Sequence, residues 1–305
     1  MKMHIANAIV ICLLLAGSAW SQDGGAETGV PVSVVVSAQA KHGTAMPVIY
    51  PEDVRVFHDG QRMKVTEWLP LQGEHAGLEL FLLVDDALDS SIGLQYRDLE
   101  NFIYAQPPTT EIALGYIRFG SVQVVQNMTK DRRSVVKALR LPMGSGTMSS
   151  PYNALTDLIQ DWPESGNRRH IFMISSGVDA LQPGPINIYL DNAIEQAQRS
   201  GIQIYSIYAS RIGYAADALS AVSWGQNNLL QLADETGGDT YLQGLQTPLS
   251  FAPYLEQFAE RLQHQYRLTF LAQAGKKGRL ETIRLQTEVP HVKLLAAERV
   301  YVPGM

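Results

Sequence analysis

Between residues 77 and 264 the sequence alternates short apolar runs with longer runs that are apolar on one helical face. Three of the short runs are 80–84, 171–174 and 202–208. Strands that alternate with helices in this way are typical of a mostly parallel sheet covered on both faces. The sequence therefore predicts an α/β fold with a doubly wound sheet over residues 77–264. In such sheets, binding sites lie at the carboxyl ends of the strands.

Residues 31–76 and 265–305 lack this alternation and read as two small β-units. Asp59-Gly60, between two alternating runs, predicts a tight hairpin turn. Because neither unit is large enough to bury a core alone, we expect the two to pack together as one accessory β-unit beside the α/β domain. The residues expected in the shared core are Val34, Val36, Val56, Phe57, Tyr266, Leu268, Phe270 and Leu285.

The N-terminus has the pattern of a secretory signal peptide. Lys2 precedes an apolar run at 9–16, and small residues follow at Ala19 and Ser21. The apolar run is too short to span a membrane. We therefore predict a signal peptide over 1–21, a flexible lead-in over 22–30, and a protein that is exported to the periplasm or secreted, without membrane insertion.

Composition excludes several classes of function. With 24 Lys and Arg against 30 Asp and Glu, the net charge is −6 and the chain has no basic run, which disfavours nucleic acid as a partner. The single Cys excludes a disulfide scaffold and a thiolate zinc site. No zinc motif occurs among the seven His, and Ser175-Ser176-Gly177 lacks the first Gly of a nucleophile elbow. We predict that the chain is not an enzyme; a hydrolase is the less favoured alternative.

Three loops that follow predicted strands carry carboxylates and hydroxyls: 85–91, 144–147 and 175–179. Oxygen ligands of this kind suit a hard divalent cation. In order and content these loops resemble a von Willebrand factor A (VWA) domain and its metal-ion-dependent adhesion site. That site takes Asp-x-Ser-x-Ser from the first strand, Thr from a middle loop, and Asp from the fourth strand.

Other segments resemble the secreted "VWFA-related" bacterial proteins that are best known from Acidobacteria. These segments are Pro51 to Gly60, Leu232 to Gly238 and His264 to Leu268. Together with the loops they cover nearly the whole chain after the predicted signal peptide. The resemblance implies a VWA fold and binding to another protein in the manner of an adhesion domain.

The metal site that the resemblance implies is degenerate in this sequence. If Asp85 is the first ligand, Ala87 and Asp89 stand at the two Ser positions. Thr147 matches the Thr, and Ser176 stands where the fourth-strand Asp is expected. We therefore expect Mg²⁺ to bind weakly or not at all, and we predict no other cofactor. The alternative to a metal site is a polar cluster held by hydrogen bonds.

A second register begins at Asp86 and places Leu88 and Ser90 at the Ser positions. We prefer Asp85, because the apolar strand ends at Val84. The partner-binding residues that we predict are Asp85, Asp86, Ser90, Thr147 and Trp224, the last in a run that reads as a polar loop. We predict an exported, non-enzymatic, adhesion-like module that binds another protein. The alternative is an envelope scaffold whose β-units form the functional surface.

Overall fold

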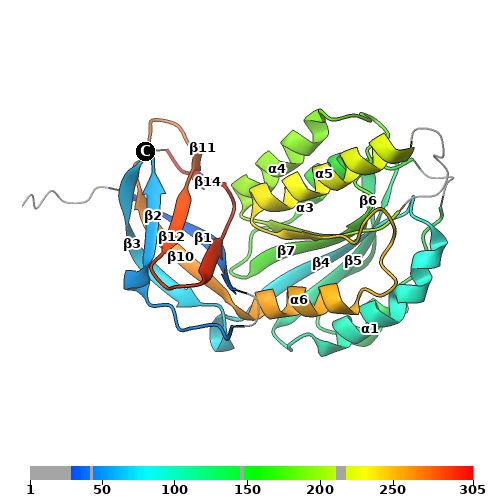
Figure 1. Ribbon diagram of the computed structural model, residues 1–305, viewed down its shortest axis with the longest axis horizontal. Coiled ribbons are helices and arrows are strands. Elements are labelled where there is room, and N and C mark those ends of the chain that lie inside the picture. The colour runs from blue at the N-terminus through cyan, green and yellow to red at the C-terminus, as the bar shows by residue number, and fades with distance from the viewer. Residues whose placement is uncertain (1–28, 42–43, 145–147, 211–217, 305) are drawn as a thin grey trace, which may run out of the picture.

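Two six-stranded sheets, in two lobes, make up the computed structural model, which describes residues 29–41, 44–144, 148–210 and 218–304 (Figure 1). The predicted signal peptide, most of the lead-in and Thr147 lie outside these residues. No helix in the described ranges is long and apolar enough to cross a membrane.

The larger lobe is an α/β domain whose sheet has the order β6-β5-β4-β7-β8-β9. Its strands are β4 (Leu78–Asp85), β5 (Thr110–Arg118), β6 (Ser121–Thr129), β7 (Arg168–Ser175), β8 (Gln203–Tyr208) and β9 (Asp239–Tyr241). All neighbours pair in parallel except β5 and β6. The predicted fold class is therefore confirmed.

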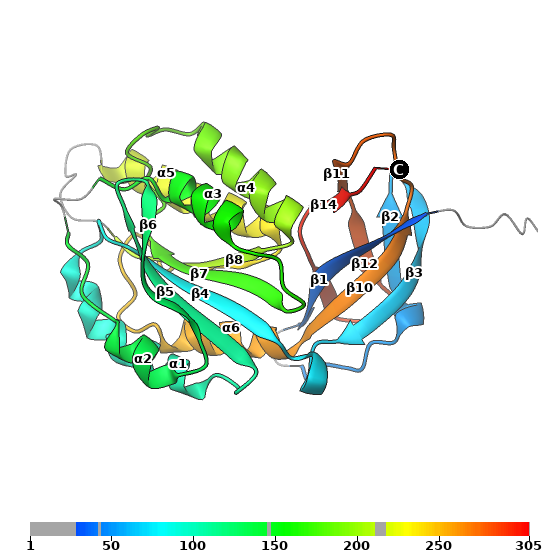
Figure 2. The same ribbon diagram turned by 180° about the vertical axis from the view of Figure 1, so that it is seen from behind.

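Helices cover both faces of this sheet (Figures 1 and 2). On one face lie α1 (Tyr96–Ala105), α2 (Arg132–Lys137) and α6 (Ala252–Gln263); on the other lie α3 (Pro151–Asp161), α4 (Ile188–Ser200) and α5 (Ala218–Thr236). Each face has its own core: Phe102, Phe172 and Phe258 pack together in the first, and Leu155, Ile194 and Leu229 belong to the second. Three short 3-10 helices, η1 (Pro51–Asp53), η2 (Gly73–His75) and η3 (Ser90–Gln95), lie in the connections.

The smaller β-lobe is built from both ends of the chain, with the strand order β12-β2-β3-β10-β1-β13 and a separate pair β11-β14. Its strands are β1 (Val30–Ala40), β2 (Val54–His58), β3 (Gln61–Pro70), β10 (Gln265–Ala272), β11 (Arg279–Thr282), β12 (Arg284–Thr287), β13 (Val292–Leu295) and β14 (Arg299–Val302). β10 lies between β1 and β3 (Figure 2). The prediction that the two β-units pack together is confirmed.

The predicted shared core is correct except at one residue. Val36, Val56, Leu268 and Phe270 are buried in it, and Val34, Tyr266 and Leu285 pack against it. Phe57 is the error. It follows Val56 on β2, and because successive side chains of a strand point to opposite faces, it lies half-buried outside this core. There the guanidinium of Arg284 covers its ring at 5.2 Å.

The hairpin between β2 and β3 has the predicted turn. Asp59 and Gly60 both adopt left-handed backbone conformations, with φ of 49° and 76°. Two residues with positive φ give a turn whose twist matches that of the flanking strands.

Candidate functional site

The two Asp residues at the end of β4 point to opposite faces of the sheet. Asp85 continues the alternation of Leu83 and contacts the face of α3, whereas Asp86 lies on the face of α1 and α2. Both side chains are fully buried. The two registers considered in the sequence therefore correspond to two separate sets of contacts.

Hydroxyl groups surround the Asp85 carboxylate. Its Oδ2 accepts hydrogen bonds from Ser149 Oγ at 2.8 Å and from Ser175 Oγ at 2.9 Å. Its Oδ1 accepts from the backbone N–H of Ala87 at 3.0 Å. Ser175 Oγ also accepts from the Gly177 N–H at 3.0 Å. Through these hydrogen bonds, Asp85 links the ends of β4 and β7 to the loop before α3.

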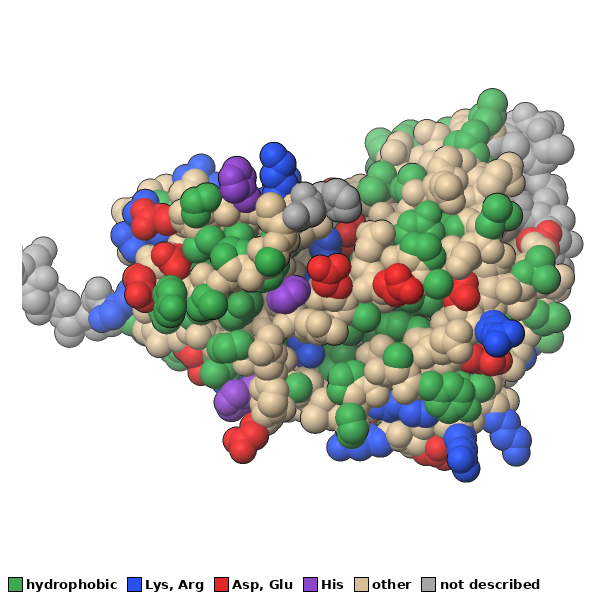
Figure 3. Space-filling view, turned by 60° about the horizontal axis from the view of Figure 1, so that its bottom comes forward, with side chains coloured by type: hydrophobic (Ala, Val, Ile, Leu, Met, Phe, Trp, Pro, Cys, Tyr) green, Lys and Arg blue, Asp and Glu red, His purple; other side chains and the backbone are tan. Residues whose placement is uncertain are grey.

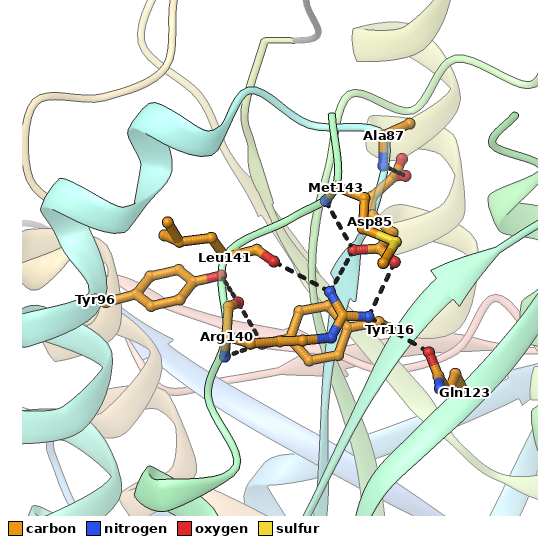
Figure 4. A network of polar contacts seen from close by, with 9 residues as sticks. Asp85, Ala87, Tyr96, Tyr116, Gln123, Arg140, Leu141 and Met143 are labelled. Carbon is orange, nitrogen blue, oxygen red and sulfur yellow. Dashed lines mark hydrogen bonds and ion pairs between the residues drawn. The ribbon is translucent and has the colours of Figure 1, made fainter. Parts of the chain in front are cut away.

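The fully buried Asp86 carboxylate forms an ion pair with Arg140, whose side chain is 31% exposed; Figure 4 shows Arg140 and its surroundings. Arg140 donates from both terminal nitrogens, at 2.6 and 2.9 Å, and the Met143 N–H donates to the same carboxylate at 3.1 Å. The guanidinium stacks 3.8 Å over the ring of Tyr116. Hydrogen bonding to Asp86 raises the pKa of Arg140 above its ordinary value. This pair gives a planar, bidentate geometry that only Arg supplies.

Two tyrosines hold the backbone of Arg140 in place (Figure 4). The hydroxyls of Tyr96 and Tyr116 both donate to the Arg140 carbonyl at 2.7 Å, and Tyr116 also accepts from the Arg140 N–H at 2.8 Å. Burial raises the pKa of both phenols, so both remain neutral donors. Sequence reasoning missed this network, since nothing in the sequence links Arg140 to Asp86.

The other predicted ligand positions are already used within the protein. Ala87 is fully buried and offers no side-chain oxygen. Asp89 accepts from the Ser91 N–H at 2.7 Å and caps η3. Ser176 is almost fully buried, and its hydroxyl accepts from the Val178 N–H at 3.4 Å. In the alternative register Leu88 is a core residue, which favours the register that begins at Asp85.

Four of the five predicted partner-binding residues lie in the described part of the chain, and they are not all on its surface. The carboxylates of Asp85 and Asp86 are buried, whereas Ser90 is exposed in η3. The predicted loop around Trp224 is wrong, because Trp224 lies half-buried within α5. Direct contact between a partner and either carboxylate stays a prediction, and it would require the hydrogen bonds described above to be exchanged.

Two glycines allow the backbone of α5 to lie close to the loop after β7. A Cβ on Gly225 would lie 2.2 Å from the Ser176 carbonyl oxygen, and one on Gly177 would lie 2.1 Å from the Gly225 carbonyl oxygen. Gly177 also has a φ of +66°. The polar residues after Trp224 therefore flank a close helix–loop contact, which a hydropathy pattern does not reveal.

Large hydrophobic side chains are exposed in the segments that follow the carboxyl ends of the strands, including η3 and the first turns of α4 and α5, and we call this set the apolar rim. Its members are Leu94, Phe119, Leu141, Met143, Met148, Leu181, Ile186, Ile188, Leu219, Leu245 and Leu249. Backbone hydrogen bonds join several of these loops, including Phe119 N–H to Met148 O at 3.1 Å and Ala180 N–H to Ser149 O at 2.7 Å. Sequence reasoning missed the rim, because exposure of an apolar residue in a loop has no periodic signal.

Comparison with known proteins gives similarity at the level of fold. No protein-family model matches the chain, and no curated protein matches it. Several similar solved structures are von Willebrand factor A domains. A von Willebrand factor type A protein from Catenulispora acidiphila is 10% identical, with a TM-score of 0.47 over 91% of this chain and 74% of that one.

Two further similar structures are also described as von Willebrand factor domains, one as a vWF domain and one as VWA2. The vWF domain of the type V pili tip protein Mfa5 from Porphyromonas gingivalis is 12% identical, with a TM-score of 0.42 over 61% of this chain and 94% of that one. The ArnB paralog VWA2 from Sulfolobus acidocaldarius is 10% identical, with a TM-score of 0.41 over 90% of this chain and 76% of that one. Hereafter we call the α/β domain the VWA-like domain.

At the predicted cation site, the described residues of the VWA-like domain offer few side-chain oxygens to a divalent cation. They contain no group of three His, Cys, Asp or Glu side chains that could hold a metal. Asp85 is the only predicted ligand with a buried carboxylate, and both of its oxygens accept hydrogen bonds from the protein. Hard cations such as Mg²⁺ favour sites whose oxygen ligands together carry negative charge. Because Thr147 lies outside the described residues, weak or absent metal binding stays a prediction.

We expect isothermal titration calorimetry with Mg²⁺ or Mn²⁺ to show weak binding or none, because Ala87 and Ser176 stand at ligand positions. The double substitution A87S/S176D returns two oxygen ligands and should raise the affinity at least about tenfold. Adding D85N to that variant is the control, and it should remove the gain. Micromolar binding by the unmodified chain that D85A abolishes would contradict the prediction. If A87S/S176D gains no affinity, the assignment of these loops is wrong.

Proposed function

We propose that this chain is an exported, non-enzymatic module whose VWA-like domain binds another protein through the apolar rim. One observation carries the proposal. Of the seventeen large hydrophobic side chains that the described residues expose, eleven follow the carboxyl ends of the strands of one sheet, in the connecting loops and 3-10 helix or at the first turns of α4 and α5. Exposed apolar side chains that are concentrated in this way, rather than scattered singly, are characteristic of protein interaction sites.

In this proposal the buried acids position the rim and do not bind the partner themselves. Asp86 fixes Arg140, which precedes Leu141 and Met143 of the rim. Asp85 fixes Ser149, which follows Met148. A hydrophobic surface that is held rigid before binding loses less conformational entropy when the partner docks. The degenerate metal site would then be a structural remnant of hydrogen-bonded polar groups.

Among the described contacts, the hydroxyls of Ser149 and Ser175 have no imidazole beside them, and the carboxylate that they contact, Asp85, is fully buried, which supports a role other than catalysis. Ser149 and Ser175 both donate to Asp85. His170, on the same strand as Ser175, contacts Gln265 near the amino end of β7. Burial lowers the pKa of His170 to about 4. A nucleophilic Ser requires a base within hydrogen-bond reach.

The test is a pull-down from the envelope fraction of the source organism, with the full exported chain as bait. Replacing the two most exposed rim residues, in the variant L94S/L249S, should reduce recovery of the partner at least about tenfold. The matched control is V48S/Y50S, which removes exposed apolar side chains from the β-lobe and should leave recovery unchanged. A chelator should have no effect.

The opposite pattern would contradict the proposal. If V48S/Y50S loses the partner and L94S/L249S retains it, the β-lobe is the functional surface, as in the scaffold alternative. Loss of the partner with a chelator alone would indicate that a metal takes part in binding.

A further inference from the structure

A recess lies between α1 and α6; it extends to the amino ends of β4, β5 and β7, and no residue of the apolar rim lines it. Its volume is about 810 Å³, and it reaches the connection between the two lobes at Leu71 to Gly73. Its apolar lining includes Leu78, Phe102, Leu255 and Leu262. Figure 3 looks onto this side of the molecule, where hydrophobic side chains are visible in a hollow. Cavities of this size, lined mainly by apolar groups, are typical of small-molecule sites.

Arg168, the first residue of β7, lines this recess with a largely buried guanidinium. Its Nη1 donates to the Leu262 carbonyl at 2.8 Å and to Gln265 Oε1 at 2.7 Å. Its Nε is buried and has no hydrogen-bond partner among the described residues. Burial lowers the pKa of Arg168 to about 10. A guanidinium remains charged at neutral pH, so this cation is held in the protein by neutral oxygens alone.

Two acids also line the recess, and neither neutralises Arg168. Asp98 Oδ2 accepts hydrogen bonds from Ser250 Oγ at 2.7 Å and from the N–H groups of Phe251 and Ala252, at the start of α6. Glu256 lies on α6 and is exposed to solvent. A buried charge that lacks a counter-ion is costly. An anion that enters the recess would relieve that cost.

We propose that the recess between α1 and α6 binds a small amphipathic carboxylate, with its carboxylate on Arg168 and its apolar body between the two helices. A carboxylate is the group that a guanidinium binds best, because the two are planar and can form parallel hydrogen bonds. The apolar lining favours a ligand with a hydrocarbon chain over a small polar anion. This site is separate from the apolar rim, so it goes beyond the proposed function and does not depend on it.

The first test compares three probes of one chain length on the full exported chain: decanoate, decanol and decyltrimethylammonium. Isothermal titration calorimetry should show decanoate binding at least about tenfold more tightly than decanol, since a charge-assisted hydrogen bond adds to the apolar contact. The cationic probe should bind more weakly than either. Equal affinities for decanoate and decanol would overturn the proposal.

The second test uses variants. R168Q should weaken decanoate binding at least about tenfold and leave decanol binding unchanged. The matched control is R97Q, which removes an exposed Arg from α1 and should bind decanoate as the unmodified chain does. A259W fills the recess without removing Arg168, so it should weaken the binding of both decanoate and decanol. This variant tests whether the probes bind in the recess even if R168Q does not fold. Unchanged decanoate binding by folded R168Q or by A259W would show that the ligand binds elsewhere.

Discussion

The substitution R140M is expected to destabilise the VWA-like domain by about 3 kcal/mol, the lower end of the cost of breaking a buried ion pair, because Asp86 is fully buried but the Arg140 side chain is 31% exposed. Asp86 is fully buried, and Arg140 supplies two of the hydrogen bonds to its carboxylate. Met keeps the length and apolar contacts of the side chain but provides no cation. Urea denaturation followed by circular dichroism measures the change in the free energy of unfolding.

The double variant R140M/D86N separates the charge from the packing. Asn keeps the shape of Asp and can still accept from the Met143 N–H, so this variant should recover at least about 2 kcal/mol relative to R140M. As a control, R267M breaks the solvent-exposed pair between Arg267 and Glu67 and should cost about 1 kcal/mol or less. A cost for R140M as small as that of R267M would mean that the Asp86–Arg140 pair contributes no more to stability than an exposed ion pair.

Deletion of residues 22–70 should make the remaining chain aggregate. The deletion removes β1 and β3, the two neighbours of β10, and also β2, the neighbour of β12. β10 would then expose both edges and the apolar side chains of Leu268 and Phe270, which are buried in the intact lobe. Unpaired strand edges of this kind associate with other chains.

Size-exclusion chromatography of the soluble fraction tests this expectation. Deletion of 22–28 alone is the control, because it keeps every described strand, the first of which begins at Val30, and should leave a monodisperse protein. A soluble, monomeric product of the longer deletion would mean that the C-terminal strands fold without the N-terminal ones.

Local patterns in the sequence were sufficient to predict most of the fold. The alternation of strands and helices after Leu78 and the hairpin at Asp59-Gly60 follow from backbone preferences and periodicity, and the structure has both. The shared core of the β-lobe followed from a size argument. Phe57 was misplaced because a run of apolar residues on a short strand does not show which face each residue occupies.

The candidate site was harder to predict, because its contacts join residues that are far apart in the chain. The end of the apolar strand favoured Asp85 as the first position, and β4 does end at this residue, but its role as a ligand stays a prediction. The partners of the two acids, Ser149 and Arg140, lie 64 and 54 residues away from them. Only the fold brings these groups together, and no spacing rule links them. Trp224 was misread as part of a loop, since polar residues and Gly are also compatible with a helix that packs closely.

The interleaved strand order of the β-lobe also sets the order in which the chain can fold. Ser33 on β1 and Thr269 on β10 are hydrogen-bonded at 2.8 Å but lie 236 residues apart. During synthesis, β1 must remain without this partner until the whole VWA-like domain has emerged. The strands of the VWA-like domain pair only with one another, so that domain can complete its sheet first. The β-lobe closes last, and until then its N-terminal strands are the part of the chain most exposed to mispairing and to proteolysis.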